Sequence, residues 1–466
     1  MNARRPLAIV CFVAALHGLF FIWYQRPDWY TRWPDQDGYR RLAEVLATTG
    51  KFTRFPDAPR FVPEVLRTPV YPLLVAATYR LFGVGQLPVA LVQTGVIVLI
   101  CLVTYGIARR VASERIALTA ATAVALFPPI AYFGALVMTE VWTTFLFTLS
   151  MWLAIRCIRT PSVGGFAALG VALALTTLSR PVFVLFPLAL AAVGIIALPP
   201  LSREPRRVKN WAAMLAVFAL SMLPWFTYNF LTIGRFTLSP AGGVGRGMWE
   251  GSWQAMWSGR LQNELTLLAD DTDDAAELDR RVEAVANREQ LPAAPMLEYV
   301  RQWRTIRRIW VEPTDPYERA LARVRADQEY FRVAVGNLRR DTLSHHVKRL
   351  ARGVFVLWAG EIPFRYSDIN TLAPVTIYVC WTVQAVVFVM ALWGILALVR
   401  AGREAEALIL AAPIVYITLV HAPLLTEARQ SLPPQPVLLV LAVAGAWSLS
   451  GQSLARETQI HERQHL

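Results

Sequence analysis

Long apolar segments separated by short polar ones run through most of the chain. A helix needs about 20 predominantly apolar residues to cross the hydrocarbon core of a bilayer. The pattern therefore predicts an all-α polytopic membrane protein, a multi-span helical bundle of about 10–13 spans. Ten of these spans can be placed, at 6–24, 88–107, 117–137, 139–156, 163–179, 181–199, 211–231, 375–398, 407–425 and 434–449.

The basic residues between the apolar segments indicate the orientation of the chain. Arg4 and Arg5 precede the first segment, and every second loop after it is also basic. Loops rich in Lys and Arg stay on the cytoplasmic side of a membrane. Both termini are therefore expected in the cytoplasm. The basic loops are "ARRVASER" at 108–115, "RCIRT" at 156–160, "SREPRRVK" at 202–209 and "RAGRE" at 400–404.

Two apolar segments need separate interpretation. The first, with its basic head, is similar to a signal peptide, but bulky "FFIWYQ" occupies the place where small residues would permit cleavage, so we expect an uncleaved span. Segment 70–83 cannot be a span without inverting the later loops. It is therefore expected to lie along the outer surface as a helix.

One long segment, 233–374, is mainly polar, with charged and apolar residues alternating as in amphipathic helices. The predicted organisation is an N-terminal transmembrane module at 1–232, which includes a first outer loop at 25–87. A helical periplasmic domain at 233–374 and a C-terminal transmembrane module at 375–466 follow.

Composition agrees with a membrane protein. Of the 466 residues 55% are hydrophobic and 17% charged, with a mean hydropathy of +0.40, which leaves too little polar surface for a soluble globule. The net charge of +13 lies in short loops, so it indicates topology and no nucleic-acid partner is expected. Cys11, Cys101, Cys157 and Cys380 have no paired spacing, which predicts neither disulfides nor a zinc motif.

Two acids follow the first span in "PDQDGYRRLAEVLATTGKF". Asp35 or Asp37 can cap a helix, and local sequence alone favours this role without chemistry. The apolar positions of that helix recur at helical spacing; they are Tyr39, Leu42, Ala43, Val45 and Leu46.

The motifs at the outer ends of the spans alter this balance. They are "RTPVYPLLVAATYRLFG", "MTE", "LSRP", "LPWFTYNFLTIGRFTLSPAGGVGRGMWEG" and "EARQSLPPQP". Together with the opening stretch, this order resembles the GT-C glycosyltransferases that use polyprenyl-phosphate sugars, in the branch of protein mannosyltransferases and lipid A aminoarabinose transferases. The resemblance covers about positions 30 to 250 and 420 to 440. It implies a helical membrane domain with an acidic first outer loop, juxtamembrane helices and a variable outer domain.

The resemblance also implies roles for individual residues. It places the family's first-loop aspartate on Asp35, with Asp37 in reserve. It places a basic residue on Arg67 ahead of the P-x-Y element, whose Tyr71 is a candidate substrate contact, and the acid of the second outer turn on Glu140. The arginine before the last span falls on Arg429. The chain departs from the family pattern at Gln36, Leu66, Tyr228 and Gln430, which suggests an altered donor or acceptor pocket.

The implied chemistry needs a base and positive charge. Asp35 can remove the proton of an acceptor hydroxyl, and a single displacement would invert the anomeric carbon. Arg67, Arg180 and Arg429 lie where apolar segments meet the outer surface, at the depth of a lipid phosphate, which guanidinium groups bind well. Arginines at this depth can also be interfacial anchors.

Other polar groups have two interpretations each. Glu140 could hold a divalent cation (Mg²⁺ or Mn²⁺) or a substrate hydroxyl, or form a salt bridge with an arginine. Trp249, with Trp253 and Trp257 at helical spacing, could stack on a sugar or pack on the membrane surface. Glu250 beside it could bind sugar hydroxyls.

Two polar clusters are expected to have structural roles. "DDTDD" at 270–274 lacks the spacing of a calcium loop and is expected to cap the next helix. His345 and His346 are adjacent, so on a helix they point about 100° apart and cannot share a metal.

Three classes of function remain open. The first is a glycosyltransferase of the bacterial inner membrane, with its active site on the periplasmic face. Its partners would be a polyprenyl-phosphate sugar, membrane lipid and a glycan, lipid or protein acceptor. A flippase or transporter would need polar groups at mid-membrane depth, where the spans have almost none. A ligase or polymerase of surface polysaccharide would take its glycan from a lipid diphosphate.

Overall fold

The computed structural model describes residues 4–26, 34–196, 205–358 and 374–451, and every regular element in these ranges is a helix. Residues 27–33 of the predicted first outer loop, 197–199 of the predicted span 181–199, 202–204 of the predicted basic loop and 359–373 of the predicted periplasmic domain lie outside the described residues. Within the described ranges, the expected all-α fold is confirmed.

Six of the helices formed by the described residues are long and apolar enough to cross a membrane. A seventh span exists if α5 (Glu114–Ala125) and α6 (Pro128–Gly134), bent by 49°, are counted together. The other three predicted spans fall on shorter apolar helices as far as they are described, so the described residues have fewer full-length spans than the 10–13 predicted. The six are α1 (Arg4–Gln25), α4 (Gln86–Val111), α7 (Glu140–Arg159), α10 (Pro205–Ile233), α17 (Pro374–Arg400) and α18 (Glu404–His421), and the shorter ones are α8 (Val163–Ser179), η2 (Pro181–Leu185) with α9 (Phe186–Ile196), and α19 (Gln435–Leu449).

The break between α5 and α6 has a clear cause. Phe127 precedes Pro128 and is extended, because a proline ring disfavours the helical conformation of the residue before it. After α6 the chain is irregular up to Glu140, and buried amides satisfy its carbonyl groups. Gln93 donates to the oxygens of Gly134 and Leu136, so non-helical backbone can persist inside the bundle.

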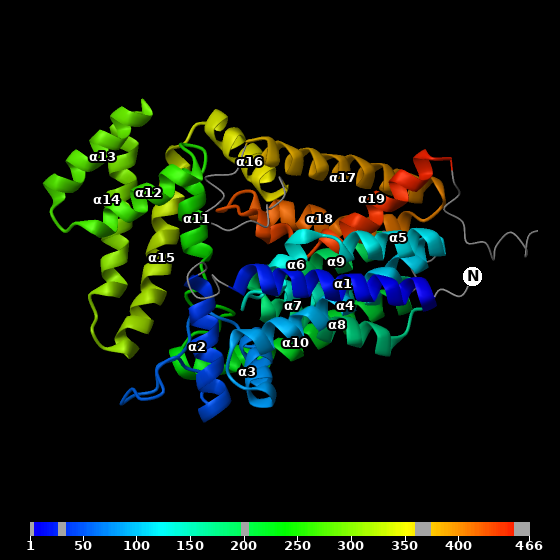
Figure 1. Cartoon of the computed structure of the whole chain (residues 1–466). Coiled ribbons are helices and arrows are strands. Elements are labelled where there is room, and N and C mark those ends of the chain that lie inside the picture. Colours follow the sequence, from blue (N-terminus) through cyan, green and yellow to red (C-terminus); the bar gives the residue numbers. More distant parts are fainter. Residues whose placement is uncertain (1–3, 27–33, 197–204, 359–373, 452–466) are drawn as a thin grey trace, which may run out of the picture.

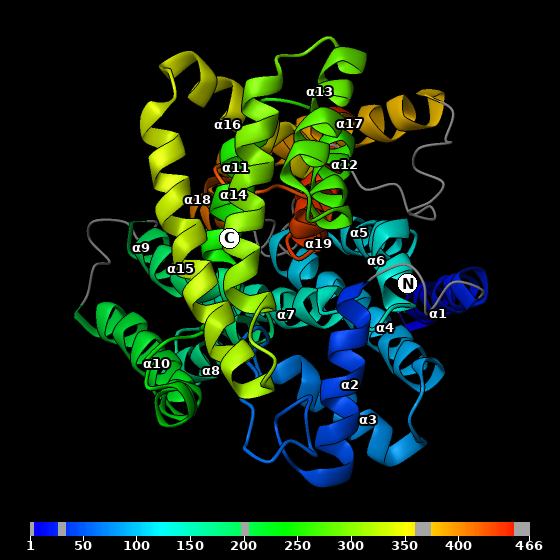
Figure 2. The same cartoon turned by 90° about the vertical axis from the view of Figure 1, so that its left-hand side faces the viewer.

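The helices of the polar region gather at one end of the bundle (Figures 1 and 2). Their core is aromatic, with Trp249 stacked on Tyr299 and Trp303. In "DDTDD", Asp274 caps α13 by accepting from the nitrogen of Ala276, as predicted. The helices are α11 (Val244–Trp253), α12 (Gly259–Asp271), α13 (Ala275–Glu289), α14 (Ala293–Val311), α15 (Pro316–Arg340) and α16 (Leu343–Trp358).

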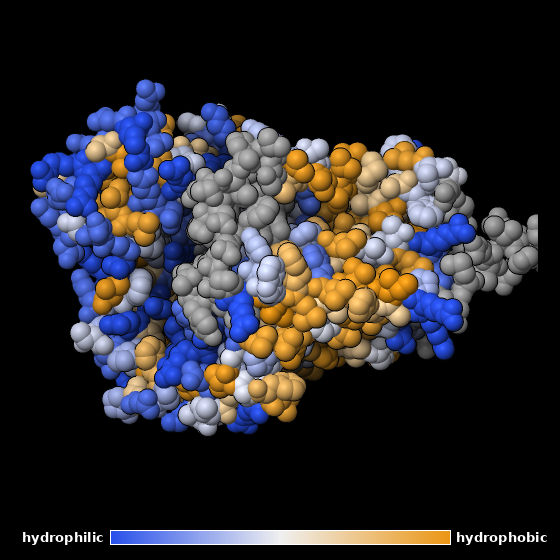
Figure 3. Space-filling view, in the orientation of Figure 1, coloured by the Kyte–Doolittle hydropathy of each residue, from blue (hydrophilic) through white to orange (hydrophobic). Residues whose placement is uncertain are grey.

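Two further helices, α2 (Pro34–Thr49) and α3 (Val70–Phe82), run across the same end of the bundle (Figure 1). The helix at 70–83 was predicted to be a surface helix, and α3 is too short to be a span. Its Leu81 and Phe82 are 74% and 63% exposed. The bundle side is largely hydrophobic and the opposite side hydrophilic (Figure 3), as expected of a multi-pass protein with a polar domain.

Candidate active site

Charged side chains from four separate segments meet where the bundle joins the polar domain. They are Asp35, Glu140, Arg180 and Arg429, which we call the junction site. Each stands at the end of a helix, where it can be charged without lying at mid-span.

Asp35 lies in the first turn of α2, which begins at Pro34. A carboxylate is favourable there, because the free N–H groups of a helix start carry partial positive charge. Asp35 and Asp37 are the second and fourth residues of α2, so neither is at the expected N-cap position. The side chain of Asp35 is 58% exposed and is accessible to a substrate.

Arg429 connects three acids. Its Nη1 lies 3.6 Å from Oδ2 of Asp35 and 3.8 Å from Oε1 of Glu140, while Nε donates to Glu427. The segment is rigid because Glu427 and Gln430 form a capping box around the short helix η4 (Ala428–Ser431). Burial lowers the pKa of Arg429, but the surrounding acids raise it by more, so this residue stays charged.

Glu140 and Arg180 form the buried side of the junction site. Pro181 ends α8 and holds Arg180 in an extended conformation, and Nη1 of Arg180 lies 3.9 Å from Oε1 of Glu140. Neither Nη1 of Arg180 nor Oε2 of Glu140 has a hydrogen-bond partner among the described residues. Buried polar atoms of this kind usually bind a ligand or water.

The expected metal role of Glu140 does not fit this arrangement. Arg180 and Arg429 both contact its carboxylate, and two cations repel a third. Across the residues that the structure describes, no three His, Cys, Asp or Glu side chains come close enough to hold a metal ion. The structure instead shows the other expected arrangement, in which Glu140 forms salt bridges with Arg180 and Arg429.

Arg67 lies at the edge of the junction site. Its Nη2 donates to the backbone oxygen of Asp35 at 3.4 Å, and its guanidinium lies 4.7 Å from the centre of the Tyr39 ring. Gly38 makes this possible, since a Cβ there would lie 1.9 Å from Nη2 of Arg67. Burial raises the pKa of Tyr39 to about 12, so its hydroxyl stays neutral.

Four other predicted site residues lie apart from the junction site. Asp37 is exposed and pairs with Arg40. Tyr71 is fully buried and donates to Gln93, so it supports Tyr39 instead of contacting a substrate. The sugar-stacking role of Trp249 is not compatible with its full burial between aromatic rings.

Glu250 is also placed within the polar domain. It forms an ion pair of 3.0 Å with Arg246. Burial raises the pKa of the Glu250 carboxyl, and Arg246 opposes this effect. The pair stabilises α11 and leaves the carboxylate engaged.

Sequence reasoning missed two residues of this region. Glu427 holds Arg429, and a signal for it was present, because it stands two positions before the arginine in "EARQ". His421 ends α18, and both of its ring nitrogens are buried without a partner among the described residues. It interacts electrostatically with Arg180. The sequence gave no comparable signal for His421, because it is a single histidine at the end of an apolar segment.

Residues 66–228 match the family model described as dolichyl-phosphate-mannose-protein mannosyltransferase. This part includes Arg67, Glu140 and Arg180. No curated protein sequence matches the chain significantly.

The fold is similar to that of solved membrane proteins. Oligosaccharyltransferase AglB from Archaeoglobus fulgidus, in complex with an inhibitory peptide and a dolichol-phosphate, matches with a TM-score of 0.54 and 13% identity over 96% of this chain and 50% of that one. The same enzyme with Zn and sulfate matches with a TM-score of 0.54 and 14% identity over 95% and 49%. The chain thus spans about half the length of this oligosaccharyltransferase.

ArnT from Cupriavidus metallidurans bound to undecaprenyl phosphate matches with a TM-score of 0.42 and 16% identity, over 95% of this chain and 77% of that one. At the level of the fold, the AglB structures agree with the resemblance found in the sequence. The chain is a multi-pass membrane protein with the fold of the GT-C glycosyltransferase superfamily, and its residues 66–228 carry the sequence pattern of the protein mannosyltransferase family.

Proposed function

We propose that the chain is a membrane glycosyltransferase that moves a monosaccharide from a polyprenyl-phosphate donor to an acceptor hydroxyl. The observation that carries this proposal is the meeting of an exposed carboxylate, Asp35, with Arg429, which also contacts buried Glu140. A base and permanent positive charge within one site are what such a transfer requires. A structural neighbour that binds dolichol-phosphate supports the choice of donor.

The transfer is a single displacement. The acceptor oxygen attacks the anomeric carbon, its proton passes to the Asp35 carboxylate, and the bond from that carbon to the phosphate oxygen breaks. The polyprenyl phosphate leaves with both electrons of that bond. Attack opposite the leaving group inverts the anomeric carbon, and holding both reactants in place supplies much of the rate.

The donor phosphate is assigned to Arg180 and Arg429. Arg180 has a buried Nη1 without a hydrogen-bond partner among the described residues, and the ring nitrogens of His421, which interacts electrostatically with Arg180, also lack one. Phosphate oxygens would accept from Arg180 and from the single N–H of a neutral His421. Arg429 stands between this place and Asp35, where it can stabilise charge as it develops on the leaving phosphate.

The membrane orientation is part of the proposal. The basic loops between spans would face the cytoplasm, and the junction site with helices α11 to α16 would face the periplasm of a bacterial inner membrane. A polyprenyl-phosphate sugar presented on that side reaches the site from the outer leaflet.

The test is transfer by the purified chain in lipid nanodiscs, with a polyprenyl-monophosphate sugar as donor and a cell-envelope extract as acceptor. Asp35→Asn removes the base at nearly constant size, and we expect the rate to fall by about 100-fold or more. Asp57→Asn is the matched control, because Asp57 is an exposed acid of the same outer loop. NMR of the product should show inversion.

Full activity of Asp35→Asn, with Asp37→Asn inactive, would move the base to Asp37. Transfer from a polyprenyl diphosphate, but not from a monophosphate, would instead support the ligase or polymerase alternative.

A further inference from the structure

Three adjoining pockets line the junction between the first outer loop and α15. Their volumes are about 80, 570 and 150 Å³. Arg323 of α15 lines all three, and Leu66, next to Arg67, lines the second and third. Because these lining residues are shared, we treat the three pockets together and call them the basic groove.

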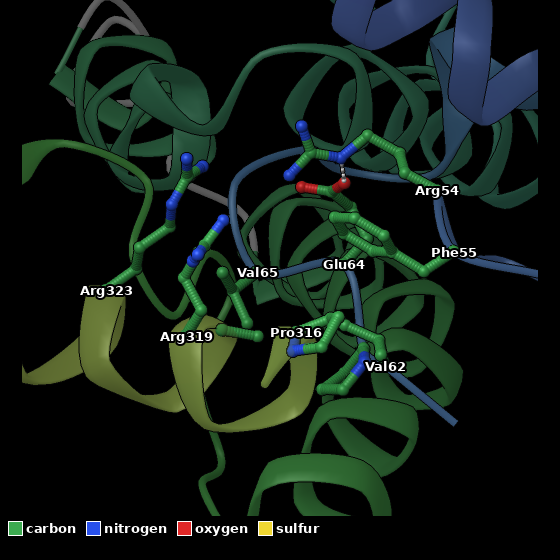
Figure 4. A pocket seen from close by; sticks show the side chains of 10 residues that line it. Arg54, Phe55, Val62, Glu64, Val65, Pro316, Arg319 and Arg323 are labelled. Atoms are coloured by element: carbon green, nitrogen blue, oxygen red, sulfur yellow. Dashed lines mark hydrogen bonds and ion pairs between the residues drawn. The ribbon is translucent and has the colours of Figure 1, made fainter. Parts of the chain in front are cut away.

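Positive charge exceeds negative charge along the basic groove. Arg319 and Arg323 point from α15 toward Arg54 and Glu64 of the outer loop (Figure 4). Glu64 forms ion pairs with Arg54 at 2.7 Å and with Arg67 at 3.9 Å. Arg41 pairs with Glu44 at 3.4 Å, so, within the described residues, the groove arginines left without a carboxylate partner are those of α15. The first two pockets together are lined by five arginines and two acids: Arg41, Arg54, Arg67, Arg319 and Arg323 against Asp37 and Glu64.

The two arginines of α15 are held in place without carboxylates. Nε of Arg319 donates to the oxygen of Pro313 at 3.0 Å, and the guanidinium of Arg323 lies 4.6 Å from the centre of the Trp310 ring. Neither forms an ion pair within the described ranges. Burial lowers the pKa of Arg323, and the charge of Arg54 lowers it further. Positive charges placed together at this cost indicate an anionic ligand.

A purely structural role explains these arginines poorly. The loop is already attached to α15 by an apolar cluster in which Val62 and Val65 pack with Ala320 and Val324. Mutually repelling guanidinium groups beside that cluster weaken the attachment. A bound anion would convert the repulsion into attraction.

The basic groove leads to the junction site. Arg67 lines the second pocket with its side chain and donates to the backbone of Asp35. Nε and Nη1 of Arg67 are buried without a hydrogen-bond partner among the described residues, and its side chain is 10% exposed. A molecule in the groove would therefore end next to the proposed base.

We propose that the basic groove binds a phosphate or carboxylate group of the acceptor and so directs an acceptor hydroxyl to Asp35. The identification of this ligand as the acceptor rests on the proposed transferase function, whereas the prediction that the groove binds an anion is independent of that function. Guanidinium groups from the loop and from α15 would hold the anion in paired hydrogen bonds.

The test measures binding by calorimetry, with the full chain in nanodiscs of phosphatidylcholine preloaded with undecaprenyl phosphate to fill the donor site. The probes are inorganic pyrophosphate and a glucuronic acid tetrasaccharide, with maltotetraose as the neutral comparison. Arg323→Gln should weaken binding of the anionic probes about ten-fold or more. Arg325→Gln is the matched control, an exposed arginine of α15 outside the three pockets, and should bind as the unchanged protein does.

Arg323→Lys keeps the charge and should restore part of the affinity, which separates loss of the site from loss of the fold. Two further arms identify the source of the anion. If phosphatidylglycerol in the disc competes with pyrophosphate in the unchanged protein but not in Arg323→Gln, a lipid headgroup supplies it. If the tetrasaccharide and pyrophosphate compete with each other and phosphatidylglycerol competes with neither, a glycan supplies the anion.

Equal weakening by Arg323→Gln and Arg325→Gln, or equal binding of maltotetraose, would overturn the proposal. Failure of the transferase proposal is distinguishable, because the unchanged protein would then transfer no sugar from a polyprenyl-phosphate donor while its anion binding stays intact.

Discussion

Arg429 is the residue that joins both sides of the junction site. It contacts exposed Asp35 and buried Glu140, and Glu427 holds its Nε. An arginine suits this position because its rigid fork can face several oxygens at once. Replacement would leave three carboxylates without their shared cation.

Arg429→Ala is therefore expected to weaken donor binding about ten-fold or more, and acceptor binding less. Binding of a polyprenyl phosphate and of the acceptor to the purified variant would be measured separately. Arg159→Ala is the control, because Arg159 also pairs with an acid, Glu406, away from the junction site. Donor affinity equal in both variants contradicts the assignment.

Gly38 provides a more subtle test at the same scale. Gly38→Ala would push the guanidinium of Arg67 away from α2, but the fold should tolerate it, because the obstacle is the flexible end of a side chain. We expect the acceptor KM to rise with donor affinity unchanged, and no loss of thermal stability. Gly164→Ala, which meets no atom within 4 Å, is the control.

An unchanged acceptor KM in Gly38→Ala would show that the position of Arg67 does not matter for acceptor binding. A rise in KM together with a loss of folded protein would point to a structural role instead.

Single residues were predictable where a motif fixes their place at a helix end, as for Asp35 and Glu140. Both acids meet arginines distant in sequence. Burial was harder to foresee, because helical spacing does not say whether a ring faces a ligand or a core. Sugar stacking was one of two roles expected of Trp249, and Tyr71 was a candidate substrate contact, but both side chains are fully buried.

At the scale of elements, η4 with Arg429 precedes α19 in the chain, and α19 packs closely on α17. Small residues permit this approach: a Cβ on Gly394 would lie 1.9 Å from the oxygen of Leu441, and one on Gly445 would lie 1.9 Å from the oxygen of Met390. Close backbone contact through small residues is a common way for membrane helices to associate.

Gly394→Ala is expected to lower the free energy of unfolding by about 1–3 kcal/mol, as overpacking does. Thermal unfolding in detergent would measure the change. Gly95→Ala on α4 is the control, since no atom lies within 4 Å of its added Cβ. Equal stability of the two variants would show that the α17–α19 contact tolerates expansion.

Apolar length and charged loops predicted where the helices lie, because the bilayer imposes both. Within the described residues, all ten predicted segments fall on helices, and 70–83 forms the short helix α3, whose place along the membrane surface stays a prediction. The division of α5 from α6 was missed, since a pair of prolines within an apolar run can be either tolerated or disruptive. The partners of the helices depend on side-chain packing, which the hydropathy pattern does not contain.

For the whole molecule, the separation of polar and apolar surface predicts one orientation. In spheroplasts of a cysteine-free variant, a membrane-impermeant maleimide should label Asn287→Cys in α13 but not Ala401→Cys in the α17–α18 turn; both positions are exposed. Permeabilisation of the membrane should allow the maleimide to label Ala401→Cys as well. The reverse labelling would invert the topology and place the junction site in the cytoplasm.

The most direct measurement of the central claim is a cryo-EM structure of the chain in nanodiscs with a polyprenyl-phosphate sugar bound. The account predicts the phosphate within about 3–4 Å of the Arg180 and Arg429 guanidinium groups, with the anomeric carbon facing Asp35. A donor bound elsewhere, with its anomeric carbon out of reach of the Asp35 carboxylate, would contradict it.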